Sequence, residues 1–254
     1  MIQRLPQFAE SHFAALCAVA GVVCNRSDQD ECGWDFFVQF PERSASMLPA
    51  DSQPAGYEAL VQVKSTRKPP LVARMKLSNA LRAVKADQPC FIVLVVEQVG
   101  GPRIYARHFW HDEIERTLRR VRMAERDGES RLNRLHMQVQ MSEADACDDL
   151  LGWMGATIGA IKSYSAEKSE FARTIGFEDG YGTLSVTLDG GIDEMLDLQL
   201  GLIESLPLSR ARYVPQRFGI ETPQPRFDVA EAHLMVTPVG KPGDCQDFRV
   251  RPGG

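Results

Sequence analysis

The pattern of apolar and polar residues divides the first third of the chain into an ordered series of elements. Residues 5–20 carry apolar side chains at helical spacing, and Gly21 follows them as a typical helix stop. A short strand is expected at VVCNR (22–26). A second, apolar and aromatic strand begins near Asp35 and ends at Pro41. A loop rich in proline, serine and alanine comes next.

The next strand, predicted over residues 57–65, has two chemically different faces. Strand side chains alternate, so Val61 and Val63 point to one side and Gln62 and Lys64 point to the other. One face is suited to a core. The other places an amide beside an ammonium group, which suits either a half-solvated strand or a catalytic one.

Three further elements complete this part of the chain. Residues 72–86 place apolar side chains at roughly helical spacing, which predicts a basic amphipathic helix. The run CFIVLVVEQ (90–98) is the most apolar strand and is expected at the centre of a sheet. RIYARHFW (103–110) is predicted as the last strand, so the order is helix, two or three strands, helix, two strands.

The rest of the chain carries weaker signals. Residues 111–135 predict a charged helix, and residues 142–173 predict a second, more apolar one. From Gly180 onward short strand patterns surround a predicted helix near residues 193–206. We therefore expect three parts, at residues 1–110, a helical segment at 111–175, and a smaller α+β region at 176–254.

Composition is that of an ordinary soluble globular protein. The chain has 254 residues, of which 44% are hydrophobic and 25% charged. Its first residues lack the apolar core of a secretory signal, and the early run LCAVAGVVC is about half of what a membrane span needs, so we expect a cytoplasmic protein without membrane association. Six cysteines form no CxxC pair, and fingerprints of serine hydrolases, P-loop ATPases and Rossmann oxidoreductases are missing from the sequence.

Charge is unevenly distributed although the net charge is only −5. Seven cations and no acidic residue occur from Lys64 to Lys85, whereas four acids and no base occur from Asp28 to Asp35. A basic run of this kind is either a solvated face or a surface for phosphate contacts. An acidic cluster near it is a candidate metal site.

The order of these features resembles the PD-(D/E)XK nuclease superfamily. Glu10 lies in the first helix, Asp35 in GWDFFV, and Gln62 and Lys64 in VQVKST, before a helix and PCFIVLVV. Within the superfamily the chain is most similar to the Mrr-like branch and to a bacterial family with GxD followed by QVKS, both of which have glutamine in place of the second acid. The resemblance covers roughly residues 5–110.

The resemblance implies an α/β fold with a restriction-endonuclease-like core, in which helices flank a mixed sheet in the order αβββαβ. It also implies a metal-dependent nuclease that hydrolyses phosphodiester bonds with Mg²⁺, or with Mn²⁺ as the alternative ion. Asp35 would be the main metal ligand, and Glu10, the Gln62 amide oxygen and the Val63 carbonyl would be further oxygen donors. Lys64 would stabilise the charge of the transition state or position the attacking water.

The glutamine at position 62 departs from the acidic consensus of the superfamily. Loss of one negative charge weakens metal binding unless Glu10 or Glu58 compensates. Without such compensation, the chain would be a catalytically degenerate module that binds nucleic acid or acts as a scaffold. A ribonuclease is the second alternative.

Each candidate residue also has an ordinary structural interpretation. Asp35 can close the turn that begins at Gly33, and Asp30 and Glu31 compete with it for a metal. Glu10 lies at the edge of its helix's apolar stripe, so it faces either the sheet or solvent. Lys64 can be a strand lysine whose stem covers apolar surface.

The expected partner is nucleic acid, with double-stranded DNA favoured. Arg67, Lys68, Arg74 and Lys76 are the candidate phosphate contacts, because they follow the proposed catalytic strand within the basic run. Members of such families act in bacterial restriction or anti-phage defence. We therefore also expect a homo-oligomer or a partner defence protein.

Overall fold

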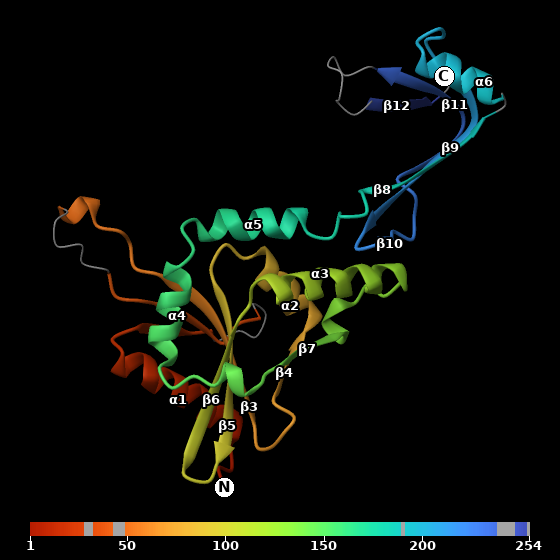
Figure 1. The fold of residues 1–254 in the computed structure, drawn as a ribbon. Helices are drawn as coiled ribbons and strands as arrows, with labels where there is room; N and C mark the ends of the chain where they lie inside the picture. The colour runs from red at the N-terminus through yellow and green to blue at the C-terminus, as the bar shows by residue number, and fades with distance from the viewer. Residues whose placement is uncertain (28–32, 43–48, 189–190, 238–246, 253–254) are drawn as a thin grey trace. The chain divides into compact units, whose positions relative to one another are not determined.

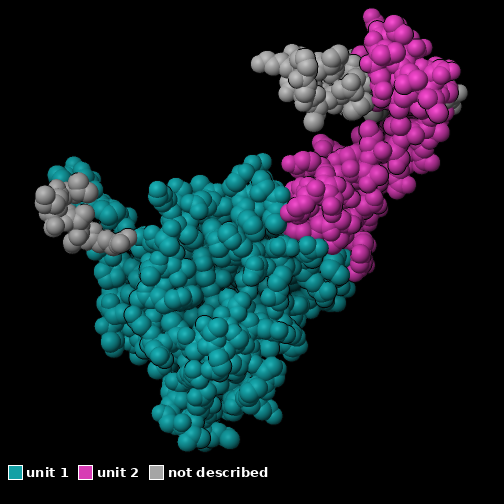
Figure 2. Space-filling model, viewed as in Figure 1, with its two compact units in different colours: residues 1–124, 129–175 teal, residues 125–128, 176–254 magenta. Residues whose placement is uncertain are grey.

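The computed structural model describes residues 1–27, 33–42, 49–188, 191–237 and 247–252. The chain divides into two compact units, one formed by residues 1–124 and 129–175 and the other by residues 125–128 and 176–254 (Figure 2). The segment 111–175, which the sequence sets apart as helical, thus falls in the first unit except for residues 125–128.

A mixed five-stranded sheet forms the centre of the first unit (Figure 1). Its spatial order is β1 (Val23–Arg26), β2 (Phe36–Gln39), β3 (Glu58–Thr66), β5 (Cys90–Gln98) and β6 (Gly101–His108). The pair β3–β5 is parallel and the other pairs are antiparallel. The apolar run expected at the sheet centre is β5, buried on both faces through residue 96.

Helices cover both faces of this sheet. One core contains α1 (Leu5–Val19) and α4 (Leu150–Gly159), packed on the side of Val61 and Val63. The other core contains α2 (Leu77–Lys85) and α3 (His111–Arg126), on the side of Leu60 and Leu94, with α5 (Tyr164–Thr174) at its margin (Figure 1). The first unit is therefore an α/β structure with a mixed sheet flanked by helices. Three 3₁₀ turns, η1 (Ala50–Ser52), η2 (Leu132–Arg134) and η3 (Glu143–Asp145), lie in its connections.

The helix predicted over residues 72–86 is wrong in its first part. Residues 72–76 form strand β4 (Val72–Lys76), and the helix α2 begins only at Leu77. β4 pairs antiparallel with β7 (His136–Gln140) in a separate two-stranded ribbon. The inward side chains of β4, Ala73 and Met75, belong to the core under α2 and α3.

The helices predicted over residues 111–135 and 142–173 are also corrected. The first predicted helix extends to residue 135, but α3 ends at Arg126. β7 begins at His136, directly after the predicted end. The second prediction divides into α4 and α5. Asp149 caps α4 by accepting a hydrogen bond from the Gly152 N–H at 3.0 Å, which starts that helix well after residue 142.

The second unit is an antiparallel β structure with one helix. Its elements are β8 (Gly182–Leu188), α6 (Ile192–Gln199), β9 (Leu206–Arg217), β10 (Ile220–Glu221), β11 (Phe227–Thr237) and β12 (Asp247–Pro252). β9 pairs with β8, β10 and β11, and β11 pairs with β12. A small apolar cluster that includes Leu198, Leu208 and Leu234 packs α6 against these strands. In the described part of the chain, no helix is long and apolar enough to span a membrane.

His108, the last residue of β6, lies in an aromatic cluster of the first unit. Its ring stacks on Phe91 and Trp110, and its Nε2 lies 2.7 Å from the hydroxyl oxygen of Tyr164. Burial, with the positive charge of Lys168 as a smaller cause, lowers the pKa of His108 to about 4. The imidazole is therefore neutral in the folded protein at neutral pH.

Acid should destabilise the protein through this histidine. Below the ordinary histidine pKa of about 6.5, His108 binds a proton in the unfolded chain but stays neutral in the folded chain. The free energy of unfolding therefore falls as the pH falls from about 6.5 toward 4. The expected contribution is on the order of 2–3 kcal/mol. Urea unfolding at several pH values should show this slope in the wild type and a smaller one in His108→Phe. Equal slopes in the two proteins would contradict the assignment.

Candidate functional site

The site begins at Asp35, the residue that immediately precedes strand β2. The Asp35 N–H donates to the Val61 carbonyl at 2.9 Å, which is the last main-chain hydrogen bond of this kind between the two strands. The next donor on β3, the Val63 N–H, donates instead to Oδ2 of Asp35 at 2.6 Å. The carboxylate therefore takes the place of a main-chain acceptor and fixes the Asp35 side chain against β3.

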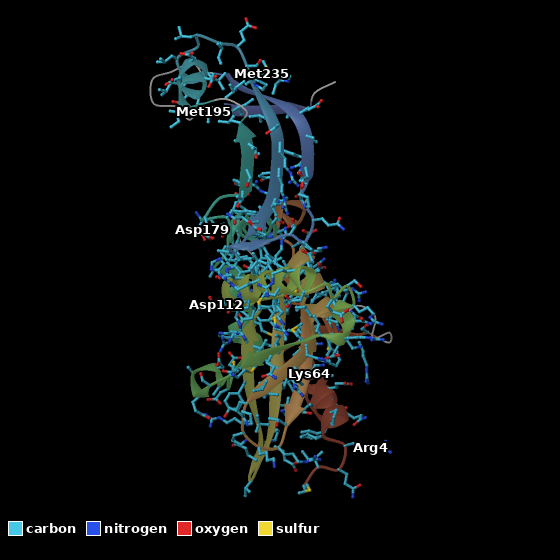
Figure 3. The ribbon with its side chains drawn as sticks, turned by 90° about the vertical axis from the view of Figure 1, so that its right-hand side faces the viewer. Arg4, Lys64, Asp112, Asp179, Met195 and Met235 are labelled. Atoms are coloured by element: carbon cyan, nitrogen blue, oxygen red, sulfur yellow. The ribbon has the colours of Figure 1, made fainter. Side chains whose placement is uncertain are left out.

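Lys64 lies beside the same carboxylate. Its Nζ is 3.7 Å from Asp35 Oδ2, with 33% of the lysine side chain and 23% of the aspartate side chain exposed. Both charges thus remain open to solvent and to a ligand. Lys64 is marked in Figure 3 within the first unit.

Gln62 is the buried member of the group, with 7% of its surface exposed. It faces the same side as Lys64, because the two residues pair with Ile92 and Leu94 of the core under α2. Its amide oxygen Oε1 is buried, and none of the described residues donates a hydrogen bond to it. An unsatisfied buried acceptor costs about 1–3 kcal/mol, so this oxygen fits a ligand that supplies positive charge or a donor.

Helix α2 covers Gln62 on the face of the sheet to which its side chain points. A small cavity lined by Gly33, Trp34, Gln62 and Asn79 separates the helix from the strand. Gly33 has a φ of +86°, and a Cβ at this position would come within 2.8 Å of the Asn79 side chain. Glycine is therefore required for the turn before Asp35 to pack against α2.

Strand geometry also directs the Val63 carbonyl toward Asp35. The N–H and C=O of one strand residue point to the same side, and the Val63 N–H points to Asp35. The Gln62 main chain faces β5 instead, because the N–H of Leu60, two residues earlier on β3, donates to the Pro89 carbonyl just before β5. The predicted donors Asp35 and Val63 are thus joined by a hydrogen bond, and Gln62 is the residue before Val63 on β3.

The two predicted auxiliary acids lie elsewhere. Glu10 accepts a hydrogen bond from Arg26 at 2.5 Å, and α1 packs on the face of the sheet opposite to that of Gln62. No hydrogen bond or ion pair joins Glu10 to Asp35, Gln62 or Lys64. Glu58 lies four residues before Gln62, or about 13 Å along the strand, where it accepts a hydrogen bond from Gln39.

The remaining acidic candidates, Asp30 and Glu31, lie outside the described residues. Within the described ranges, no group of three or more histidine, cysteine, aspartate and glutamate residues is arranged to hold a metal ion. A metal held by the described site would therefore have one carboxylate and otherwise neutral oxygen ligands.

Two of the four predicted nucleic-acid contacts lie next to the site. Arg74 and Lys76 line a cleft of about 310 Å³ together with Gln62, Lys64, Met75, Asn79 and His136. Arg67 does not line this cleft. It forms an ion pair with Glu97 at 3.1 Å and donates a hydrogen bond to the Ile2 carbonyl at 2.7 Å. Lys68 is exposed beyond the end of β3 and does not line this cleft.

Asn79 and His136 are residues of the cleft that the sequence did not identify. His136 begins a segment, HMQVQM, in which apolar Met137, Val139 and Met141 alternate with polar residues. That alternation is a strand signal and would have predicted β7. Nothing comparable distinguishes Asn79, a polar residue at a buried position of a short helix.

A scan of the chain against protein-family models finds no match, and neither curated proteins nor solved structures match it significantly.

Replacement of Gln62 by leucine tests whether this residue serves stability or a ligand. Leucine has a similar volume and removes the unsatisfied amide oxygen, so Gln62→Leu should leave the free energy of unfolding unchanged or raise it by about 1–2 kcal/mol. Chemical denaturation measures the change, with Asn79→Leu as a comparison at the facing position. A loss of 2 kcal/mol or more would show that the amide has a partner in the folded protein.

Proposed function

We propose that the first unit is a metal-dependent nuclease of the PD-(D/E)XK type, with a restriction-endonuclease-like core, which hydrolyses phosphodiester bonds of double-stranded DNA. One observation carries the proposal. The Asp35 carboxylate, held by the Val63 N–H at 2.6 Å, lies 3.7 Å from Lys64 Nζ, and the unsatisfied Gln62 oxygen belongs to the same strand end. An acid before one strand and a lysine on the next match the motif, and glutamine replaces its second acid.

The residues present fit a hard divalent cation such as Mg²⁺ or Mn²⁺. Oxygen donors suit such ions, and the buried Gln62 Oε1 has no other partner among the described residues. Asp35, Gln62 and the Val63 carbonyl would hold the ion, and Mg²⁺ keeps several waters, so an incomplete set of protein ligands is acceptable. When bound, the ion would act as a Lewis acid toward the scissile phosphate.

The protein's own side chains then account for the rest of the chemistry. Hydrolysis joins a water oxygen to phosphorus and breaks one P–O ester bond, with negative charge building on the phosphate oxygens. Lys64, a point charge that is one-third exposed, would stabilise this charge, and Asp35 holds its ammonium in place. The cations Arg74 and Lys76 in the adjoining cleft would bind neighbouring phosphates.

A nucleic-acid-binding module without cleavage is the second candidate. Two features favour it: glutamine occupies the position of the second acid, and Asp35 Oδ2 already interacts with Val63 and Lys64. Both features weaken the attraction for a metal ion. The basic cleft serves binding equally well in either case.

Cleavage of a plasmid separates the two candidates. The purified full chain with Mg²⁺ should nick or linearise supercoiled DNA, and Asp35→Ala and Lys64→Ala should each lower the rate by at least 100-fold. EDTA should abolish the activity. Nicking at the same rate by all three proteins would indicate a contaminant and refute the proposal, and preferential cleavage of single-stranded RNA would support a ribonuclease instead.

Restoring the acid at position 62 gives a second test. Gln62→Glu adds a negative charge at the proposed metal site, so the Mg²⁺ concentration needed for half-maximal cleavage should fall severalfold, and a degenerate site would gain activity. Isothermal titration with Mn²⁺ gives an independent measure of the same affinity. An unchanged metal affinity in Gln62→Glu, with the fold intact by circular dichroism, would place the metal away from Gln62.

A further inference from the structure

The ribbon β4–β7 has one apolar and one polar face. Ala73, Met75, Met137 and Val139 point into the core, whereas Arg74, Lys76, His136, Gln138 and Gln140 are exposed on the outer face. The register places Arg74 opposite Gln138 and Lys76 opposite His136. The outer face therefore carries cations and hydrogen-bonding amides but no carboxylate.

A second cleft, of about 330 Å³, lies between this outer face and α3. It is lined by Arg116, Arg119, Arg120, Met123, His136, Met137, Gln138 and Gln140. His136 also lines the cleft that contains Lys64, so the two hollows adjoin at this residue. A basic surface thus runs from Lys64 across the ribbon to the arginines of α3.

The cations of this surface differ in how far acidic side chains neutralise them, and Lys64 is paired with Asp35. Arg119 pairs with Glu115 at 2.9 Å, and Arg116 lies 3.9 Å from the buried Glu113 while it donates to the Gln138 carbonyl at 2.8 Å. Arg74 and Arg120 have no ion-pair partner among the described residues. An excess of positive charge in two adjoining hollows fits a polyanion.

We infer that this surface is a track for one phosphate backbone of duplex DNA, leading from the catalytic end at Lys64 over β4 and β7 to α3. The inference rests on the proposed function in one respect, because that function makes Lys64 the catalytic end of the track. It adds His136 and the α3 arginines Arg116, Arg119 and Arg120 to the contacts, and it leaves Arg67 out.

The side chains in the two clefts favour a duplex over a single strand. Proteins that bind single-stranded nucleic acid combine basic grooves with aromatic side chains on which unpaired bases stack. Neither cleft is lined by a phenylalanine, tyrosine or tryptophan. The one aromatic ring that lines the two clefts among the described residues is the imidazole of His136, so charge and amide groups predominate, which suits a ligand whose bases are already paired and stacked.

Binding of a fluorescent duplex tests the track. The full chain is titrated into a mixed-sequence duplex of about 20 base pairs, and fluorescence anisotropy measures binding. EDTA in the buffer removes divalent metal ions and so prevents cleavage. Arg74→Gln combined with Arg120→Gln should weaken binding at least tenfold and reduce the slope of log K against log salt by about 2, because each lost phosphate contact removes about 0.9 from the slope.

The matched control is Arg82→Gln combined with Lys85→Gln. These two cations are exposed on α2 and line neither cleft, so the net charge change is equal and binding should stay within about twofold of the wild type. An equal effect of the two pairs, or tighter binding of the same oligonucleotide as single-stranded DNA or RNA, would overturn the inference.

This experiment is independent of plasmid cleavage. If the wild type binds the duplex through the track but does not cut plasmid, the nuclease proposal fails and the track stands. If the wild type cuts plasmid and Arg74→Gln with Arg120→Gln binds and cuts like the control pair, the track fails and the nuclease proposal stands.

Discussion

The parallel pairing of β3 with β5 is the constraint on which the arrangement of the first unit depends. Parallel neighbours cannot be joined by a tight turn, so the chain must cross over one face of the sheet between them. Here the crossover consists of β4 and α2, and it covers the face that carries Gln62 and Lys64. The same connection that completes the core therefore brings Arg74, Lys76 and Asn79 over the two polar residues of β3.

The site also depends on an interruption of pairing. The Asp35 N–H still bonds to the Val61 carbonyl, but the next donor on β3, the Val63 N–H, bonds to the Asp35 carboxylate instead of a main-chain oxygen. This fixes the Asp35 carboxylate beside Val63, the residue that follows Gln62 on β3. The turn at Gly33, which packs against Asn79, holds the start of β2 in this place. Rigidity at the strand end comes from main-chain geometry, whereas Lys64 adds only an exposed ion pair worth about 0.2–1 kcal/mol.

Local patterns predicted the parts of the fold that depend on local sequence. The alternation in β3 and the apolar run of β5 indicated both strands, and the facing of Gln62 and Lys64 to one side follows from that alternation alone. The prediction of a helix over residues 72–86 failed because β4 is fixed by its partner β7, some sixty residues later, and by burial of Ala73 and Met75. Tertiary packing buries Gln62 and keeps Glu58 and Glu10 away from it. A short sequence motif does not predict such packing.

A glutamine at position 62 is consistent with this packing. Position 62 is buried under α2, so a carboxylate there would lose its hydration, which favours the protonated form. The neutral amide avoids this cost and still offers an oxygen. Lys64, Arg74 and Lys76 then supply the positive charge around Gln62, and Asp35 is the carboxylate that pairs with Lys64.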